Sequence, residues 1–264
     1  MIRRVRYRLR QAAEQFYARR LRQRLNRHGQ IPNHIGVIID GNRRWAKQAG
    51  FANPSVGHRY GAEHIEDLLQ WCQRLTIDHV TIFVCSTENL TRRAANEVAS
   101  LMNLIETTIS RLLTRPDSSW RVHVAGNPDV LPDTTATALK DLSNQTAVLD
   151  TNRHLTLAVG YGGRQEILDA FTSYLQEQSA AGNSLGDLAE TFTASDIDRH
   201  LYQPTLPEPD IIIRTSGEQR SSNFLIWQGS QAEYFFCDAY WPSFREVDLL
   251  RAVRDYSRRR MTAS

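Results

Sequence analysis

The chain has 264 residues, of which 41% are hydrophobic, so it is long enough to bury one sizeable core. It has no run of 18 apolar residues and no apolar signal-peptide segment, which excludes a membrane-spanning or secreted protein. Three widely spaced cysteines, Cys72, Cys85 and Cys237, match no metal-ligand pattern. We interpret them as reduced structural thiols of a cytoplasmic protein.

The positive charge of the chain is concentrated at its N-terminus. Residues 1–30 carry ten arginines and one acid, Glu14, for a local charge of +9, whereas the remaining residues sum to −6. This segment is predicted to be a basic amphipathic helical extension, followed by a catalytic domain over 31–264. Two interpretations stay open: peripheral contact with an anionic membrane, or packing on the body. Nucleic acid is disfavoured, because the body is acidic and has no recognisable binding motif. The predicted apolar side consists of Val5, Leu9, Phe16, Tyr17, Leu21 and Leu25.

Downstream of the basic segment, strand-like and helix-like patterns alternate at close spacing. Alternation of this kind predicts an α/β fold, a single domain with a mostly parallel central β-sheet flanked by helices. Strands are expected over 34–40, 79–85, 120–125, 154–160, 210–214 and 232–237. Helices are expected over 42–50, 59–75, 95–114, 132–149, 164–178, 194–201 and 245–260, with a polar bend near 179–186.

The first motif directly follows a buried strand and runs from Asp40 to Trp45. Gly41 allows close backbone approach, while Arg43 and Arg44 supply forked donors, a combination typical of a phosphate site. A carboxylate in so cationic a place is explained if Mg²⁺ bridges Asp40 to phosphate oxygens. The alternative is that Asp40 merely caps a surface helix. His58 is a further candidate for holding the same anion.

A second motif follows the strand at 210–214 and also indicates anion binding. Arg214, Arg220 and Ser222 lie in a Ser/Gly-rich segment, where arginines and hydroxyls can converge on one phosphate. The alternative is a solvated basic loop. Two phosphate sites in one α/β domain suggest two phosphorylated substrates that react with each other. A kinase or ATPase is disfavoured, because no Gly-x4-Gly-Lys-Ser/Thr loop is present.

Several motifs together resemble the ordered set of the cis-prenyltransferases, the undecaprenyl diphosphate synthase family. The resemblance covers about residues 31–256 and looks closest to actinobacterial members, which include short-chain Z,E-farnesyl diphosphate synthases. The motifs that carry it are 34–47, 57–59, 86–89, 160–164, 213–224 and Ala232-Glu233.

The resemblance implies a fold, a chemistry and a set of residue roles. It implies a homodimer with an apolar substrate tunnel, and an Mg²⁺-dependent enzyme that condenses isopentenyl diphosphate with an allylic diphosphate. Asp40 and Glu233 would bind Mg²⁺, and Asp40 and Asn89 would be catalytic. The allylic diphosphate would be held by Gly41, Asn42, Arg43, Arg44, Trp45 and His58. Isopentenyl diphosphate would be held by Arg214, Arg220, Ser221 and Ser222, with Ser86, Thr87, Glu88 and Arg92 lining the substrate site.

The chain departs from the family pattern at a few positions. Asn53 replaces a frequent arginine, and the C-terminal Arg-x-Gly is missing, with Arg259 or Arg260 as substitutes. Leu90 and Gln219 replace a frequent tryptophan and histidine.

Product length is a further implication of the resemblance. In the family, a small alanine at the position of Val84 accompanies long products. The bulkier Val84 favours a short product made from geranyl diphosphate, such as Z,E-farnesyl diphosphate. An ordinary buried strand would also choose valine here. The alternatives are a long-chain decaprenyl or undecaprenyl diphosphate synthase, a non-catalytic partner subunit, or a basic binding module.

Overall fold

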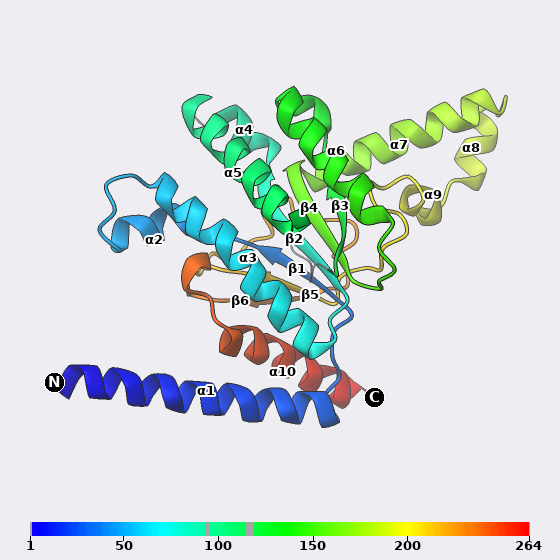
Figure 1. Ribbon diagram of the computed structural model, residues 1–264. Coiled ribbons are helices and arrows are strands. Elements are labelled where there is room, and N and C mark those ends of the chain that lie inside the picture. Colours follow the sequence, from blue (N-terminus) through cyan, green and yellow to red (C-terminus); the bar gives the residue numbers. More distant parts are fainter. Residues whose placement is uncertain (1, 93–94, 115–118, 264) are drawn as a thin grey trace. The chain divides into compact units, whose positions relative to one another are not determined.

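The computed structural model describes the backbone of residues 2–92, 95–114 and 119–263, and the side chains of 12–90, 98–108 and 119–262. Figure 1 shows the chain as a ribbon coloured along the sequence. The chain forms two compact units. Unit 1 comprises Met1–Val80, Pro209–Gln219 and Ala232–Ser264, and unit 2 comprises Thr81–Glu208 and Arg220–Gln231.

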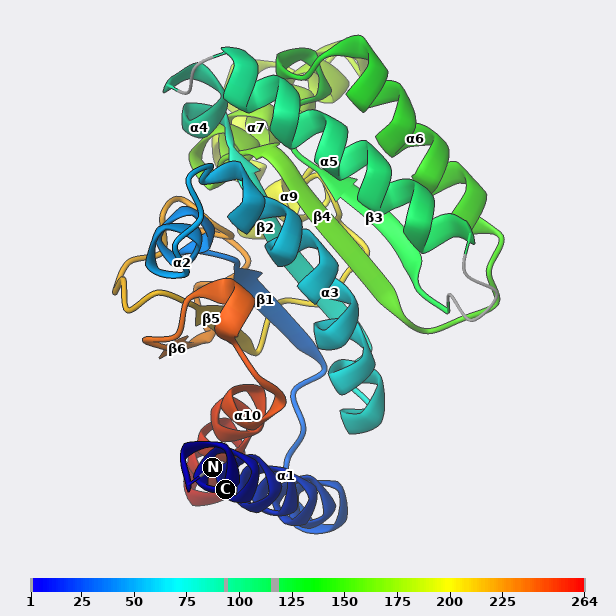
Figure 2. The same ribbon diagram turned by 60° about the vertical axis from the view of Figure 1, so that its left-hand side comes forward.

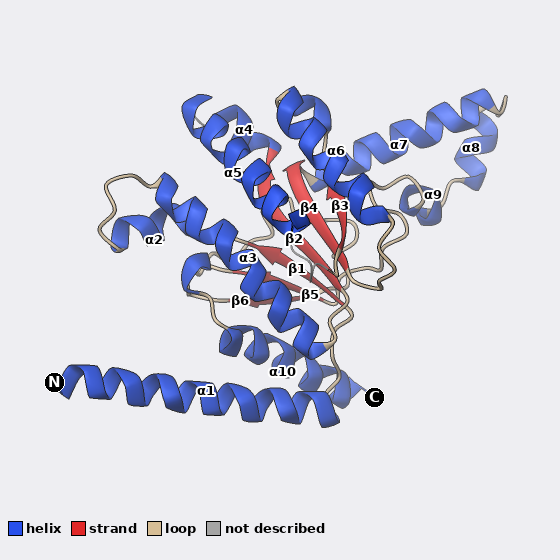
Figure 3. Cartoon of the chain, viewed as in Figure 1, coloured by secondary structure: helices blue, strands red, loops and turns tan. Residues whose placement is uncertain are grey.

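Helices and strands alternate along the chain as the sequence predicts (Figure 3). The helices are α1 (Ile2–His28), α2 (Asn42–Gln48), α3 (Ser55–Leu75), α4 (Thr87–Arg92), α5 (Ala95–Thr114), α6 (Asp133–Ala147), α7 (Gly163–Ala180), α8 (Leu185–Thr191), α9 (Ala194–Asp198) and α10 (Glu246–Ala263), with 3-10 turns at Pro128–Val130 and Trp241–Ser243. The strands are β1 (His34–Ile38), β2 (His79–Ser86), β3 (Arg121–Ala125), β4 (His154–Tyr161), β5 (Ile211–Arg214) and β6 (Glu233–Phe236). Over the described residues these strands make one sheet in the order β3-β4-β2-β1-β5-β6.

In unit 1, β1, β5 and β6 are parallel neighbours. Ile38 pairs with Arg214, so β1 and β5 end at the same level and the residues that follow them share one edge of the sheet. Strands β1 and β5 are fully buried, as expected for apolar β-branched runs in a parallel sheet, whereas no residue of β6 is fully buried. Helix α3 buries Ile65, Leu68, Leu69, Cys72 and Leu75, which confirms the predicted helical spacing.

In unit 2, β3 and β4 are parallel and pair Val122 with Leu155. Helix α6 buries Leu139 and Leu142 completely or nearly so. The strands β3 and β4 and helix α6 therefore contribute to the core of this unit.

Helix α1 packs against the C-terminal helix α10, beside which it runs in both ribbon views (Figures 1 and 2). Ala18, Leu21 and Leu25 are buried, and Glu14 accepts a 2.6 Å hydrogen bond from Arg245. Phe16 is 63% exposed and therefore lies outside this packed face. The packing interpretation holds for Leu21 and Leu25, while Val5 and Leu9 lie outside the described side chains.

Two helices differ from the sequence-based expectation. Helix α8 begins inside the predicted bend at 179–186, because Ser184 and Asp187 form a capping box that starts a helix within a polar segment. Helix α4 follows β2 directly and is not among the helices that the sequence predicts. The three cysteines form no disulfide, in agreement with the prediction. Among the described helices, none combines the length and apolar character of a membrane span.

Candidate active site

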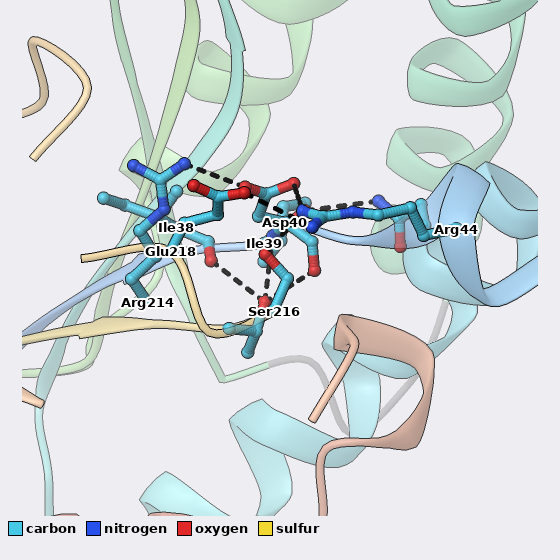
Figure 4. Close-up of polar contacts among 9 residues, drawn as sticks. Ile38, Ile39, Asp40, Arg44, Arg214, Ser216 and Glu218 are labelled. Carbon is cyan, nitrogen blue, oxygen red and sulfur yellow. Dashed lines mark hydrogen bonds and ion pairs between the residues drawn. The ribbon is translucent and has the colours of Figure 1, made fainter. Parts of the chain in front are cut away.

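Asp40 lies just beyond β1, with an arginine on each carboxylate oxygen. Arg214, at the end of β5, donates from Nη2 to Oδ2 at 2.8 Å, and Arg44, in the first turn of α2, donates to Oδ1 at 3.3 Å. The two guanidinium groups approach from different sides (Figure 4). The Asp40 side chain is 31% exposed, whereas that of Arg214 is only 4% exposed. The arrangement is a carboxylate held between fixed cations yet still open to a ligand.

The charge of Asp40 is stabilised by these cations. Its partial burial acts to raise the pKa, but the hydrogen bond from Arg214 and the charges of Arg214 and Arg44 outweigh burial and lower the pKa below its ordinary value. The Asp40 carboxylate is therefore ionised at neutral pH. The interpretation of Asp40 as a plain helix cap does not fit, because the N-cap residue of α2 is Gly41.

Thr215 fixes the backbone that carries Asp40. The Asp40 amide donates to Thr215 Oγ1 at 2.9 Å, and the Thr215 hydroxyl donates to the Asp40 carbonyl oxygen at 2.7 Å. Next to it, Ser216 accepts a 2.8 Å hydrogen bond from Arg44, and Glu218 accepts one at 3.3 Å. None of these three supporting residues was predicted from the sequence to belong to the site. Their position directly after Arg214 is the signal that could have found them.

Gly41 and Asn42 position the start of α2. Gly41 has φ +99°, and a Cβ there would lie 2.6 Å from the Tyr240 ring, so only glycine fits. The buried Asn42 amide donates to the Ile39 carbonyl at 3.2 Å, and its Oδ1 would lie 2.5 Å from a Cβ at Gly61. These two residues thus hold the start of α2 against its neighbours, a packing role that the motif did not reveal.

The remaining residues of the first motif have different surroundings. Arg43 is exposed, and His58 is half-buried in the first turn of α3. Trp45 packs against aromatic rings, with its centroid 5.0 Å from Tyr60 and 5.9 Å from Phe51. The geometry by itself gives Trp45 a packing role.

In unit 2, Ser86 is the last residue of β2. Its hydroxyl oxygen accepts a 3.1 Å hydrogen bond from the backbone amide of Asn89, so Ser86 caps the start of α4. Thr87 donates to the Gly160 carbonyl at 3.1 Å, while the Glu88 and Asn89 side chains are exposed. The Arg92 side chain lies outside the described residues. The cap explains why Ser86 stands at the end of the strand.

The segment from Arg220 to Asn223 also belongs to unit 2, whereas Arg214 belongs to unit 1. Arg220 is exposed, and Ser221 and Ser222 are half-buried. Ser222 and Asn223 adopt the left-handed conformation, with φ of 50° and 63°. Asn223 holds this turn to the start of α7, since its Oδ1 accepts from the Arg164 amide at 2.9 Å and its carbonyl accepts from the Gly163 amide at 2.7 Å. A strained backbone fixed in this way is typical of a binding loop.

Glu233 begins β6 and is not brought to Asp40 within unit 1. In the parallel register Glu233 pairs with Ile211 and Phe236 pairs with Arg214, so Glu233 lies at the other end of the strands from the Asp40 edge. Its carboxylate forms an ion pair with Arg259 at 3.1 Å. Within the described part of the chain, no three metal-ligating side chains cluster. The role of Glu233 as a metal ligand stays a prediction.

A comparison with known proteins places these features in a family. A family model described as "Putative undecaprenyl diphosphate synthase" matches residues 38–263. The chain belongs to this family. An isoprenyl transferase from Streptomyces fradiae is 57% identical over 92% of the chain and 94% of that protein. A (2Z,6E)-farnesyl diphosphate synthase from Mycolicibacterium smegmatis is 44% identical over 96% of the chain and 95% of that protein.

A solved structure extends the agreement to the fold. Lavandulyl diphosphate synthase from Lavandula x intermedia, crystallised with dimethylallyl diphosphate, matches with a TM-score of 0.78 and 30% identity, over 86% of the chain and 95% of that structure. The family resemblance and the parallel α/β fold predicted from the motifs are thereby confirmed.

Proposed function

We propose that the chain condenses isopentenyl diphosphate with geranyl diphosphate to give (2Z,6E)-farnesyl diphosphate and free diphosphate. The observation that carries this proposal is the ionised Asp40 carboxylate held between Arg214 and Arg44 at the carboxyl ends of β1 and β5. Ligands of parallel α/β sheets bind at this edge. The farnesyl diphosphate synthases among the relatives, at 44% identity, support the substrate class and the short product.

The donor set at Asp40 fits Mg²⁺. The cation binds proteins through one or two carboxylates and completes its coordination with water and substrate phosphate oxygens. Asp40 offers such a carboxylate, ionised and partly exposed. Bound Mg²⁺ would supply positive charge for the departing diphosphate. A contribution from Glu233 would have to come from a second copy of the chain, because within one chain the register holds it away from Asp40. This is consistent with the expected homodimer.

The two basic motifs divide the substrates between them in this proposal. The first motif holds the allylic diphosphate through Gly41, Asn42, Arg43, Arg44, Trp45 and His58. The second holds isopentenyl diphosphate through Arg214, Arg220, Ser221 and Ser222. Ser86, Thr87, Glu88 and Arg92 line the substrate site. Arginines suit both tasks, because their planar forks match phosphate oxygens bidentately.

In the proposed reaction the C4 carbon of isopentenyl diphosphate forms a bond to the C1 carbon of the allylic substrate, whose C–O bond to diphosphate breaks. A proton then leaves C2 of the isopentenyl unit to give the cis double bond and passes to the released diphosphate, and Asn89 assists its removal by orienting the two groups. Fixed arginines stabilise the leaving diphosphate and hold the two anions in a reactive orientation, which provides most of the rate enhancement. Exclusion of water protects the allylic cation.

The short product is assigned on Val84, in β2. Its side chain is half-buried, whereas Phe83 and Cys85 on either side are buried, so Val84 faces a less filled space. We propose that this space is the apolar tunnel of the growing chain and that Val84 limits its length. Residues 31–264 form the catalytic domain of a cytoplasmic homodimer, and residues 1–30 form its basic extension.

The test is incorporation of radiolabelled isopentenyl diphosphate with C5, C10 and C15 allylic primers, with Mg²⁺ and with a chelator. We expect Mg²⁺-dependent incorporation that is fastest with the C10 primer. Absence of incorporation with every primer would favour a non-catalytic partner subunit. Products of C50 or longer would replace the short-chain proposal with the polyprenyl alternative.

A further inference from the structure

A groove of about 720 Å³ runs between α1 and α10, both in unit 1. Leu21 and Leu25 form its floor, where α1 packs on α10. This groove is separate from the Asp40 site, since none of the residues of either basic motif lines it. It contains residues that the transferase reaction does not explain.

Four arginines line the groove: Arg20 and Arg24 from α1, and Arg254 and Arg258 from α10. No acidic side chain lines it among the described residues. Arg254 is ion-paired to Asp255 at 2.7 Å, outside the lining, so the positive charge of the groove comes mainly from Arg20, Arg24 and Arg258. A cationic groove of this kind attracts anions, and phosphates above all.

Exposed apolar side chains accompany these arginines. Phe16 is 63% exposed, Met261 59% and Tyr17 42%, and all three line the same groove. The Arg20 guanidinium lies 5.7 Å from the Phe16 ring centroid, and Arg254 donates to the Tyr17 hydroxyl at 3.4 Å. This arrangement suits the surface of a bilayer, where lipid phosphates lie just above the acyl chains. Arginines can contact the phosphates while the apolar side chains beside them reach the acyl chains.

The opposite flank of α1 provides an internal contrast. A second groove there is lined by Arg19, Arg22, Arg74 and Arg245, but also by Glu14 and Glu246. Glu246 pairs with Arg22 and with Arg74, and Glu14 pairs with Arg245. Arg22, Arg74 and Arg245 of this flank are thus paired with acidic side chains within the fold. The second groove is therefore an interface within the protein. The first groove, by contrast, has positive charge that no acidic side chain of its described lining neutralises and that can bind a partner.

We propose that the α1–α10 groove is a docking surface for a lipid bilayer that contains anionic phospholipids. Arg20, Arg24 and Arg258 contact lipid phosphates, and Phe16 and Met261 insert at the acyl boundary. A second copy of the chain does not fit as the occupant, because a two-fold contact would bring like-charged arginines together. Nucleic acid fits poorly, because the exposed apolar groups would remain in water. The proposal does not depend on the transferase activity.

The test is co-sedimentation of the full chain with vesicles of 30% phosphatidylglycerol in phosphatidylcholine, compared with phosphatidylcholine alone. Each arginine near an anionic surface increases partitioning roughly fivefold. The double variant Arg20→Gln/Arg24→Gln should therefore bind about 30-fold more weakly than the unmodified chain. A matched control, Arg74→Gln/Arg245→Gln, removes two arginines that are paired with acidic side chains on the other flank and should change binding less than about threefold. Binding of the unmodified chain should fall at 0.5 M salt, since surface charges are screened.

Three results would overturn the proposal: equal binding of both double variants, equal binding of the unmodified chain to neutral vesicles, or undiminished binding of Phe16→Ser. A change in oligomeric state of Phe16→Ser, measured by light scattering without lipid, would make the groove an interface between copies instead. If soluble glycerol phosphate at millimolar concentration displaced the protein from the vesicles, the groove would be a site for free anions instead of a membrane surface. Both double variants should keep full transferase activity with soluble primers. Loss of that activity would show that a variant has not folded.

Discussion

Asp40 is held in place at both its backbone and its side chain. Thr215 fixes its backbone, and two arginines bind its carboxylate. We expect Asp40→Asn, which keeps the size of the side chain but removes its charge, to lower kcat by about 100- to 1,000-fold or more. Single-turnover kinetics at saturating Mg²⁺ measure this. Asp129→Asn, at an exposed position, is the control and should be fully active. An active Asp40→Asn enzyme would remove Asp40 from the reaction.

The lowered pKa of Asp40 also predicts how stability depends on pH. The unfolded chain binds a proton on Asp40 near the ordinary pKa of 3.8, and the folded chain does so only at lower pH. The stabilisation by ionised Asp40 is therefore complete above that value and lost as the pH falls below it, through the folded pKa. Urea unfolding of the unmodified chain and of Asp40→Asn should show a difference in free energy that narrows below pH 3.8. A difference that does not vary with pH would contradict the ion pair.

The two basic residues assigned to isopentenyl diphosphate differ in burial, and this separates their expected effects. Arg214→Ala and Arg220→Ala should each weaken productive binding by about 2–3 kcal/mol, through loss of a charge-assisted contact. Arg214→Ala should also destabilise the fold, because Arg214 is buried against Asp40. The exposed Arg220 should leave stability unchanged. Steady-state KM values and urea titrations measure both effects, and unchanged KM values would make the second motif an ordinary surface loop.

At the scale of elements, Glu166 joins three segments of unit 2. Its carboxylate accepts hydrogen bonds from the Tyr161 hydroxyl at the end of β4, the Tyr202 amide at 3.1 Å and the Gln228 amide at 3.0 Å. Gln228 lies in the same segment as Arg220, 220–231. Glu166 therefore acts as a positioning residue for that segment.

Glu166→Ala removes the shared acceptor of one buried and two half-buried donors, so it should cost about 2–4 kcal/mol of stability. KM for isopentenyl diphosphate should rise, while KM for the allylic primer should change little. Glu177→Ala, on the same helix with a 63% exposed carboxylate, is the matched control and should leave both KM values unchanged. Equal changes in the two KM values would indicate a general loss of folding instead.

The elements themselves were largely predictable from sequence, because apolar periodicity records which face of each helix and strand is buried. Ile65, Leu68, Leu69 and Cys72 specify α3 in this way. Helix α8 was not predictable by the same means, since it begins at a capping box inside a polar segment and buries only Leu188. Local hydrogen bonds, which leave no hydrophobic pattern, decide its start.

At the scale of the whole molecule, the sequence predicted the ends of β1 and β5 as the place of the chemistry but not the contacts made there. Arg44, Ser216 and Glu218 meet near Asp40 only because parallel register brings strand ends far apart in sequence to one edge. The register of β6 likewise separates Glu233 from Asp40, although both belong to the motif set. Motifs specify which residues matter, and tertiary pairing decides which of them meet.

Product length is a property of the whole folded chain, and Val84 is the residue proposed to limit it. Val84→Ala should lengthen the product distribution, because growth stops sterically when the chain reaches a closed end. Val122→Ala, in the core of β3 with 3% exposure, removes the same atoms elsewhere and should lower stability without lengthening the product. Chromatography of dephosphorylated products measures chain length. An unchanged distribution in Val84→Ala would remove this residue from length control.

The most direct test of the central claim is the structure of the product made from geranyl diphosphate and isopentenyl diphosphate. The product is dephosphorylated and compared by gas chromatography and mass spectrometry with authentic Z,E- and E,E-farnesol. The proposed function predicts a C15 alcohol that co-elutes with Z,E-farnesol and is absent when the enzyme carries Asp40→Asn. An E,E product would contradict the cis condensation itself.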